Sequence, residues 1–374
     1  MLLKMLEQMM ATLRIRVMVL VLVGAIIPDW VMTPSPATAQ EQLRVESREK
    51  QLRSTSDFVF PGSKDHQDKS HAVWGFNNGI RIGIRPTPGP EGLIRVYAPY
   101  LEQEFPRVVN FISIEPAVPK RPGRGQSELE ISRMRPEERG LTFWASNTLS
   151  ENRPMADGES LPTGTLSADG QVLTVFIHCE RFANDAKPII ECRFHNDRPY
   201  EVEFILHAAE DSGPMQSCTL SSTMANYGQL RQLHLAERTV TAKELWTTDE
   251  ALDPLGFMPW HSFPSSEMTS DGSILFVAAS SDMTDPKEVV YADGTAPHWK
   301  YQGIPAIHYW KTAKANQPRV AVNGRRTYWM SQSPIPGGSA FENFELAMPF
   351  REGLTLQFGV KPAGSVDGPA HSKE

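Results

Sequence analysis

The sequence predicts an all-β protein, built as one large antiparallel β-sandwich with at most one or two short helices. Many short segments of the 374-residue chain alternate apolar and polar side chains, which is the pattern of half-buried strands. Turn sequences separate these segments, and 30 prolines leave little room for long helices. We find no internal repeat, which argues against a propeller or a solenoid.

The N-terminus predicts export. Basic residues up to Arg16 precede an apolar run over residues 17–27, and Ala37-Thr38-Ala39 fits a signal-peptidase site. The apolar run is shorter than the roughly twenty residues that span a bilayer. We therefore expect residues 1–39 to be a signal peptide, and the protein to be periplasmic or extracellular with no membrane span after signal removal.

The rest of the chain divides into three parts by composition. Residues 40–70 are polar and charged and predict a flexible N-terminal arm, in which only the FVF segment resembles a strand. Residues 71–362 hold the strand-like segments and predict a single β-sandwich domain. The polar residues 363–374 predict a disordered tail.

The segment from residue 74 to residue 116 predicts three consecutive strands. Isoleucines at 80, 82 and 84 alternate with Arg81, Gly83 and Arg85. A Pro- and Gly-rich turn near Gly89 leads into a second alternating run. A hairpin centred there places Ile82 opposite Val96 and Arg81 opposite Tyr97. The aliphatic face is expected to be buried. The other face carries Arg81, Arg85, Arg95 and Tyr97 and is either a solvated surface or a ligand site.

Further strands follow in order. Residues 139–147 alternate between apolar and mostly polar side chains and predict a strand. Asp169-Gly170 predicts a hairpin turn, and residues 195–199 predict a turn between two more strands. We expect one short helix over residues 228–237 and a packed aromatic loop over residues 253–264. Later strands are predicted over residues 273–280, 304–311, 319–322 and 325–330. Asn323-Gly324 is expected to join the last two of these as a two-residue hairpin. Two further strands are predicted, one on each side of Arg351-Glu352-Gly353.

Composition and missing motifs exclude several functions. With 37 basic and 44 acidic side chains the net charge is −7, which lacks the basic field that nucleic-acid binding needs. There is no nucleophile elbow, HExxH helix, Walker loop or Rossmann glycine pattern. The ten histidines are dispersed, so we expect no bound metal and no cofactor. The sequence does not indicate a particular protein partner.

Three cysteines leave at least one without an intramolecular partner. Cys179 and Cys192 lie on segments expected to form a hairpin, and an exported protein permits a disulfide there. Small buried thiols are the equally supported alternative.

Aromatic loops and carboxylates supply the candidate functional residues. Trp260-His261 and His298-Trp299 lie in proline-containing connections, where an indole either stacks on a sugar ring or plugs the end of the sandwich. Carboxylates that could serve acid–base chemistry are Glu115, Glu128, Glu130, Glu342 and Glu345. Glu115 is the foremost of them, because it ends a strand among largely apolar neighbours and should pair with an arginine or have a raised pKa.

The WGFNNGIRIGIRPTPGPEGLIRVYAPYL, VVNFISIEP and FENFELAMPF segments carry a resemblance. The chain resembles an uncharacterised family of exported bacterial proteins with a galactose-mutarotase-like β-sandwich, the class that includes aldose epimerases and domains of polysaccharide-degrading enzymes. The resemblance implies sugar binding on a concave sheet face. Epimerases of that class use a glutamate base and a histidine acid. This chain lacks their histidine motif and has no residue that matches their catalytic glutamate, so epimerase activity is not implied.

The leading hypothesis is therefore an exported protein that binds or processes a carbohydrate, with an acidic or sulfated glycan favoured by the arginines. The expected ligand-contacting residues are Trp74, Arg81, Arg95, Tyr97, Trp260, His261, His298 and Trp299, and the expected acid–base residues are Glu115 and His207. The alternative hypothesis is a non-catalytic envelope or assembly protein. It predicts a flat aromatic patch for a protein partner and no deep cleft.

Overall fold

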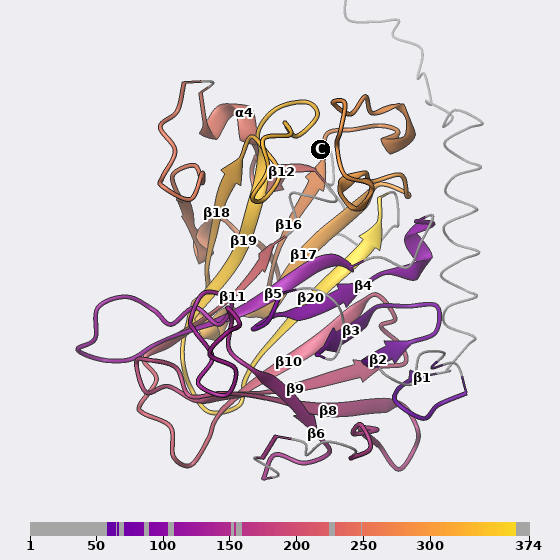
Figure 1. Ribbon diagram of the computed structural model, residues 1–374, viewed down its shortest axis with the longest axis vertical. Coiled ribbons are helices and arrows are strands. Elements are labelled where there is room, and N and C mark those ends of the chain that lie inside the picture. Colours follow the sequence, from indigo (N-terminus) through magenta and orange to yellow (C-terminus); the bar gives the residue numbers. More distant parts are fainter. Residues whose placement is uncertain are drawn as a thin grey trace, which may run out of the picture. The chain divides into compact units, whose positions relative to one another are not determined.

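The structure is a computed structural model that describes residues 58–64, 66, 71–85, 90–103, 108–150, 153–154, 159–223, 229–247 and 249–363. The expected signal peptide, most of the expected arm and residues 364–374 of the expected tail lie outside the described residues. The described part confirms the all-β prediction: it consists of two large antiparallel sheets, with short helical turns between strands (Figure 1).

The first sheet has nine strands and contains the segment from residue 74 to residue 116. Its strands in spatial order are β1 (Phe58–Val59), β2 (Ala72–Phe76), β3 (Arg81–Ile84), β4 (Ile94–Tyr97), β5 (Val108–Ala117), β11 (Ser217–Thr223), β19 (Ala340–Pro349), β18 (Arg319–Arg325) and β14 (His261–Pro264). The sheet thus begins at Phe58, inside the segment expected to be an arm. The order also places β5 beside β11, about a hundred residues further along the chain.

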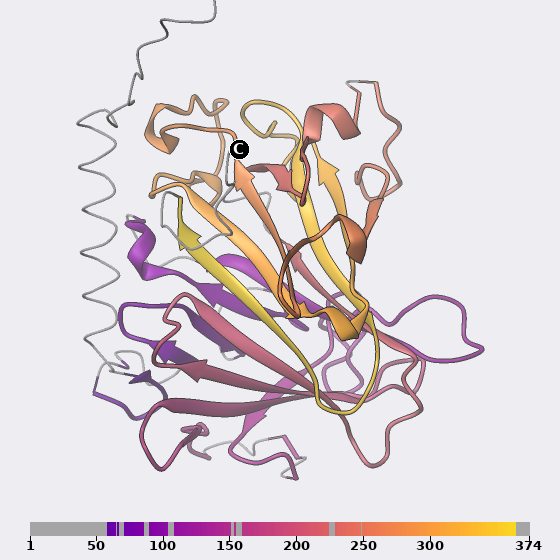
Figure 2. The same ribbon diagram turned by 180° about the vertical axis from the view of Figure 1, so that it is seen from behind.

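The second sheet has eleven strands, and nine of them follow one another across it. These are β13 (Thr239–Thr241), β12 (Leu230–His234), β16 (Ile274–Ser281), β17 (Ala306–Ala313), β20 (Leu354–Pro362), β10 (Glu201–Ala208), β9 (Pro188–His195), β8 (Val172–Cys179) and β6 (Phe143–Ser146). Two short strands extend it, β15 (Thr269–Asp271) beside β16 and β7 (Thr165–Leu166) beside β8. Seen from behind, β20 runs between β17 and β10 (Figure 2).

Several predicted turns and registers are confirmed. Arg81 pairs with Tyr97 and Ile82 with Val96. Asp169-Gly170 lies in the turn between β7 and β8, where Gly170 adopts a φ of 69°. Residues 196–200 separate β9 from β10. The turn at Gly353 also joins two strands, but β19 belongs to the first sheet and β20 to the second, so this turn crosses between sheets.

The hydrophobic core lies between the inward faces of the two sheets. One continuous cluster includes Trp74 and Phe344 from the first sheet and Phe204, Trp310 and Phe358 from the second, all fully buried. Each such side chain contributes roughly 1.5–3 kcal/mol on leaving water. Side chains along β5 alternate between the two faces of the sheet: Ile112 and Ile114 enter this core, while Phe111 and Glu115 line a pocket on the opposite face.

Two polar contacts cross the core and link the sheets. The indole Nε1 of Trp310 on β17 donates to the backbone oxygen of Phe344 on β19 at 3.1 Å. The amide Nδ2 of Asn110 on β5 lies 3.2 Å from Nδ1 of His308 on β17. Burial lowers the pKa of His308 to about 3, so its ring is neutral and Nδ1 can accept this hydrogen bond.

The helix predicted over residues 228–237 is wrong. Residues 230–234 form strand β12, because Leu230 and Leu233 are buried and the strand pairs with β13 and β16. The α-helix of the described region is α4 (Ala242–Leu245), which begins with a capping box between Thr241 and Glu244. The 3-10 turns are η1 (Pro99–Leu101), η2 (Ser265–Glu267), η3 (Pro286–Glu288), η4 (Pro297–Trp299) and η5 (Lys314–Asn316). Among the described residues, no helix is long and apolar enough to cross a membrane.

The three cysteines are free and buried, so the structure favours buried thiols over a disulfide. Burial raises the pKa of the Cys179, Cys192 and Cys218 thiols well above the ordinary value, which keeps them protonated.

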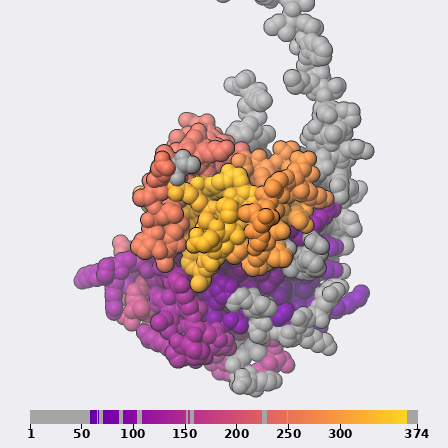
Figure 3. All heavy atoms as spheres, turned by 45° about the horizontal axis from the view of Figure 1, so that its top comes forward, coloured from indigo at the N-terminus to yellow at the C-terminus, as the bar shows by residue number. Residues whose placement is uncertain are grey.

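Long connections gather at one end of the sheets. The segments before β14, before β17 and before β19 lie side by side there, coloured salmon, orange and yellow in the view onto this end (Figure 3). They carry the aromatic residues that the sequence analysis placed in loops.

Candidate functional site

A pocket of about 720 Å³ opens over the face of the first sheet that points away from the core. Its polar lining residues come from strands β5, β11, β18 and β19 and from the connections around them: Glu115, Arg124, Gln126, Glu128, Thr223, Asp253, Asn323, Glu342, Asn343 and Glu345. Its ring-bearing lining residues are Pro90, Phe111, Phe257, Trp260, His298, Trp299 and Trp329. This combination of flat apolar surfaces with hydrogen-bonding groups is typical of a small-molecule site.

A β-bulge in β19 brings two adjacent residues to the pocket. Along β18, Asn323 pairs with Asn343 and Gly324 pairs with Phe341, so Glu342 is an extra residue in β19. Phe341 and Phe344 therefore both enter the core, while Glu342 and Asn343 both line the pocket. The two-residue hairpin predicted at Asn323-Gly324 is wrong, because this dipeptide lies within β18 opposite the bulge.

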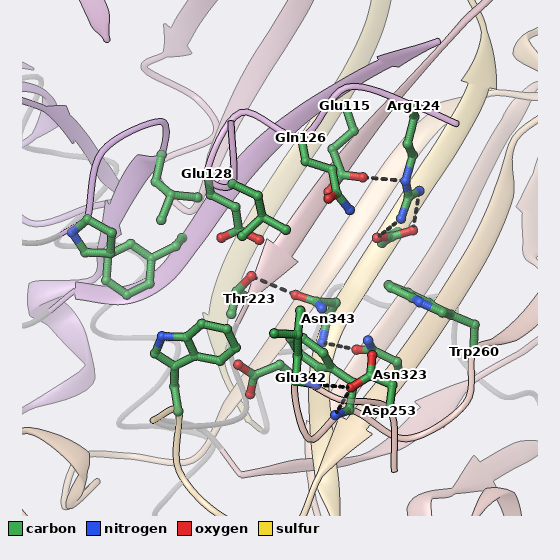
Figure 4. A pocket seen from close by; sticks show the side chains of 18 of the residues that line it. Glu115, Arg124, Gln126, Glu128, Thr223, Asp253, Trp260, Asn323, Glu342 and Asn343 are labelled. Atoms are coloured by element: carbon green, nitrogen blue, oxygen red, sulfur yellow. Dashed lines mark hydrogen bonds and ion pairs between the residues drawn. The ribbon is translucent and has the colours of Figure 1, made fainter. Parts of the chain in front are cut away.

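An arginine and two glutamates form a cluster at one side of the pocket (Figure 4). Arg124 donates from Nη1 and Nη2 to the two carboxylate oxygens of Glu345, at 2.8 and 2.7 Å. Its Nε lies 2.5 Å from Oε2 of Glu115, an ionic contact that lacks hydrogen-bond geometry. The guanidinium also lies over the ring of Trp260, 5.6 Å from its centroid.

This cluster carries little net charge near neutral pH. Burial and the nearby Glu345 raise the pKa of Glu115 to about 8, although Arg124 opposes the shift. Burial also raises the pKa of Glu345, while Arg124 lowers it. Because one guanidinium faces two carboxyls, one carboxylate can balance its charge while the other keeps a proton. The expectation that Glu115 pairs with an arginine or has a raised pKa thus describes both of its properties.

Two other pocket glutamates form no ion pair and no side-chain hydrogen bond among the described residues. Glu342 is 2 % exposed, and its Oε2 has no hydrogen-bond partner. Burial raises its pKa to about 7, with Arg325 opposing and Glu128 adding to the shift. Burial also raises the pKa of Glu128 to about 7, with Arg139 opposing and Glu345 adding to it. Both groups therefore change protonation near neutral pH.

Amides and a hydroxyl lie between these carboxyls (Figure 4). Oγ1 of Thr223 donates to Oδ1 of Asn343 at 2.8 Å, and Oδ1 of Asn323 accepts from the backbone nitrogen of Asn343 at 3.1 Å. The Asn343 amide nitrogen is left to serve as a donor to a ligand hydroxyl or carbonyl.

Aromatic residues form the walls, and buried groups hold them in place. Arg325 lies 4.8 Å from the ring centroids of both Phe257 and Trp329, and its Nη1 donates to the backbone oxygen of Leu255. Trp299, on η4, stacks on the buried ring of Tyr328 with 4.8 Å between centroids. These aromatic rings are therefore held in place before a ligand binds, so binding loses little side-chain entropy.

The connection between β5 and β6 positions Glu128 and Arg124. Ser127 donates from Oγ to the backbone oxygen of Gly92 at 2.6 Å and accepts at Oγ from the backbone nitrogen of Ile114 at 2.9 Å. Further along, Glu180 accepts hydrogen bonds from the backbone nitrogens of residues 133, 134 and 142. This connection is therefore anchored on both sides of Glu128.

The structure brings together four of the ten predicted site residues. Glu115, Trp260, His298 and Trp299 all line the pocket. Trp260 is 44 % exposed and is thus available to a ligand.

The remaining predicted residues lie outside the pocket. Trp74 is fully buried and donates to the backbone oxygen of Pro162, and Arg95 is 1 % exposed and donates to backbone oxygens of residues 90 and 93. The prediction that Arg95 lies on a ligand-facing or solvated face is wrong, because it folds back onto its own turn. Arg81 and Tyr97 are half-buried opposite each other, and Arg81 donates to backbone oxygens of residues 76 and 77.

The two other predicted histidines are also placed elsewhere. His207 lies on β10 in the second sheet, between Glu191 at 3.0 Å and Glu352 at 2.5 Å. These carboxylates raise its pKa, and it does not meet Glu115. His261 packs edge-on against Trp246, with 5.6 Å between centroids. Of the carboxylates considered, Glu130 instead accepts from the backbone nitrogens of residues 126 and 183.

Sequence reasoning missed several pocket residues. Arg124, Gln126, Phe257, Asn323, Trp329 and Asn343 were not singled out. The sequence predicts a packed aromatic loop over residues 253–264, and the aromatic content of this loop is a signal that could have found Phe257. No sequence signal points to Asn323 or Asn343, because an alternation pattern does not reveal a bulge. Among the described residues, no group of three or more His, Cys, Asp or Glu side chains is arranged to hold a metal ion.

Comparison of the sequence with protein-family models and with curated proteins found no match. The function of this protein therefore has to be inferred from the pocket itself.

Proposed function

We propose that this protein binds a carbohydrate in the pocket above β5, β11, β18 and β19. One observation carries the proposal: a cavity of about 720 Å³ combines supported tryptophan faces with carboxyl, amide and hydroxyl groups on its floor. Aromatic faces pack against the C–H patches of sugar rings, and the polar groups bind ring hydroxyls. A flat patch for a protein partner would not need such a cavity, which favours the carbohydrate over the protein-interface hypothesis.

The charge distribution favours a neutral glycan over an acidic or sulfated one. Arg81 and Arg95, which motivated an anionic ligand, do not line the pocket. Arg124 does, but Glu115 and Glu345 already face its guanidinium. An anionic sugar would also meet Glu128 and Glu342, which form no ion pair in the described part of the structure and would repel it once ionised.

The export prediction fits this proposal. A signal peptide over residues 1–39 would deliver the protein to the periplasm or the cell exterior, where oligosaccharides of cell walls and extracellular matrices occur. We propose this location together with the carbohydrate ligand.

A thermal-shift screen tests the proposal. The protein is heated with neutral, uronic-acid and sulfated oligosaccharides, and a neutral oligosaccharide is expected to raise the midpoint by several degrees at about 100 times its Kd, because it binds only the folded state. Trp260→Ala should strongly reduce the shift. Leu166→Ala is the matched control, since Leu166 on β7 is similarly exposed, at 46 %, and lies outside the pocket. The absence of a shift with every glycan would contradict the proposal.

A further inference from the structure

Two carboxyl groups reach the same cavity from different elements without a partner. Glu128 projects from the connection after β5 and Glu342 from the bulge of β19, and both point toward the space between them (Figure 4). Neither makes a hydrogen bond or an ion pair to another described side chain. The other two glutamates of the pocket, Glu115 and Glu345, are both engaged by Arg124.

The structure holds these two groups in place at a cost to stability. The bulge takes Glu342 out of regular pairing with β18, and this side chain is 2 % exposed. Glu128 follows Ser127, whose side chain is fixed by two hydrogen bonds. A buried carboxyl such as Glu342 that forms no ion pair destabilises a fold, so its presence in a cavity indicates a use in function.

The surroundings make the two groups complementary. The charge of Arg325 favours ionisation of Glu342, and the charge of Arg139 favours ionisation of Glu128. The charge of Glu345 opposes ionisation of Glu128, and the charge of Glu128 opposes ionisation of Glu342. Ionisation of one carboxyl makes ionisation of the other harder, because like charges repel across the cavity. Near neutral pH, the arrangement therefore favours one protonated and one ionised carboxyl, which is the pairing that glycosidic-bond cleavage requires.

We propose that this protein hydrolyses a glycosidic bond of a neutral oligosaccharide, with Glu128 and Glu342 as its acid–base pair. This activity rests on the carbohydrate binding proposed above. The volume of the pocket, in the upper part of the range of roughly 300–1,000 Å³ for small-molecule sites, leaves room for more than one sugar ring. The bond between two rings can then lie at the carboxyl pair.

The reaction balances with water as the co-reactant. The protonated carboxyl transfers its proton to the glycosidic oxygen while the bond from this oxygen to the anomeric carbon breaks. The ionised carboxylate takes a proton from a water molecule, whose oxygen forms a bond to the anomeric carbon. One water is consumed and two shorter sugars leave. The pair then exchanges one proton with solvent to return to its starting state.

The test uses as substrate the neutral oligosaccharide that gives the largest thermal shift. This oligosaccharide is incubated with the protein, and newly formed reducing ends are measured together with the chain lengths of the products. Cleavage is expected, and Glu128→Gln and Glu342→Gln should each lower kcat by at least about 100-fold, the usual contribution of an acid–base group, while the thermal shift persists. Glu210→Gln, an exposed site outside the pocket, should retain the activity.

Two results distinguish this activity from the binding on which it rests. If the oligosaccharide binds but is not cut, or only its anomers exchange, hydrolysis is overturned and the binding proposal stands. If no oligosaccharide shifts the midpoint, both are overturned. Cleavage that survives both glutamine substitutions would show that another group performs the chemistry. The persistent thermal shift of each variant separates lost chemistry from lost folding.

Discussion

Two buried glutamates show how partners decide the role of a carboxyl. Glu180 accepts hydrogen bonds from Ser132 and from the backbone nitrogens of residues 133, 134 and 142. Burial opposes its ionisation, but these bonds outweigh burial and hold its pKa below the usual value. Glu342 has no such partners, and burial raises its pKa. Glu180 therefore stabilises the fold, whereas Glu342 destabilises it once ionised.

This contrast leads to a stability prediction for Glu342→Gln. The folded-state pKa of about 7 lies above the ordinary 4.5, so the native protein holds this proton longer than the unfolded chain and loses stability as pH rises from 4.5 to 7. At pH 8 the substitution should stabilise the protein by up to about 3 kcal/mol, because each pKa unit corresponds to about 1.4 kcal/mol. At pH 4 it should have almost no effect. Denaturant unfolding at both pH values measures this.

The control for this prediction is Glu210→Gln, which should change the unfolding free energy at neither pH. A loss of stability at pH 8 in Glu342→Gln would mean that Glu342 has a stabilising partner when ionised. Higher stability combined with lost turnover would be the signature of a residue retained for function.

The bulge in β19 decides which side chains reach the pocket. Regular alternation after Phe341 would place residue 342 at the pocket and residue 343 in the core. The extra residue instead keeps Phe344, Leu346 and Met348 in the core and adds a second polar side chain to the pocket. On its other side, β11 pairs regularly with β19 from Asn343 to Pro349.

Single-residue deletions test this account of the strand. Deleting Glu342 should leave a regular strand with Phe341 and Phe344 still in the core, so the unfolding midpoint should stay within about 5 °C of the parent. Deleting Glu345 should turn Leu346 and Met348 out of the core. Burying such a side chain is worth roughly 1.5–3 kcal/mol, so the second deletion should cost more than about 3 kcal/mol or prevent folding. Thermal unfolding of the parent and of the two deletion variants measures this difference.

The matched pair removes the same residue type from the same strand, but Glu345 also pairs with Arg124, so Glu345→Gln is the control for the loss of that ion pair. Equal damage by both deletions would contradict the role of Glu342 as the extra residue.

At the scale of the whole molecule, buried titratable groups limit stability from both sides of the pH range. Burial lowers the pKa of His178 to about 4 and of His308 to about 3, and it raises the pKa of Glu128 and Glu342 to about 7 and of Glu115 to about 8. The histidines are neutral in the fold. Between about pH 4.5 and 7 the glutamates are protonated in the folded protein but ionised in the unfolded chain.

These shifts predict a stability maximum near pH 5. Below about pH 6.5 the unfolded chain protonates histidines that the fold keeps neutral, so stability falls toward acid. Above about pH 4.5 the unfolded chain releases carboxyl protons that the fold retains, so stability falls toward pH 8. Chemical denaturation from pH 3 to pH 9 measures the profile. A maximum near pH 8 would contradict the raised carboxyl pKa values, and replacing His308 should flatten only the acid side.

Local patterns predicted the strands and the tight turns, because a strand's alternation and a turn's backbone conformation depend on neighbouring residues. The hairpin of β3 and β4 is an example, with Arg81 opposite Tyr97 as expected. The same rules failed for β12, where pairing with β13 and β16 overrides a segment that resembles a helix. They also failed at Asn323-Gly324, where a turn-forming dipeptide lies inside a strand.

For the candidate site, the sequence predicted suitable residue types but not which of these residues would lie together. Trp260, His298, Trp299 and Glu115 were chosen because their residue types suit a sugar site, and these four do line one pocket. Trp74 and Arg95 have equally suitable types but are buried. Exposure depends on which side of a strand packs on the opposite sheet, and several strands of this protein are too short or too irregular for alternation alone to decide it.

The sequence by itself determined the all-β class and most of the strand segments, since these follow from local alternation and turn chemistry. Only the tertiary structure decided that β5, β11, β19 and β18 lie side by side, and so that Glu115, Glu128, Glu342 and Glu345 share one cavity. The physical reason is that pairing between distant strands depends on burying a common core. Many orders of strands share the same local patterns, whereas the packing of the whole chain selects one.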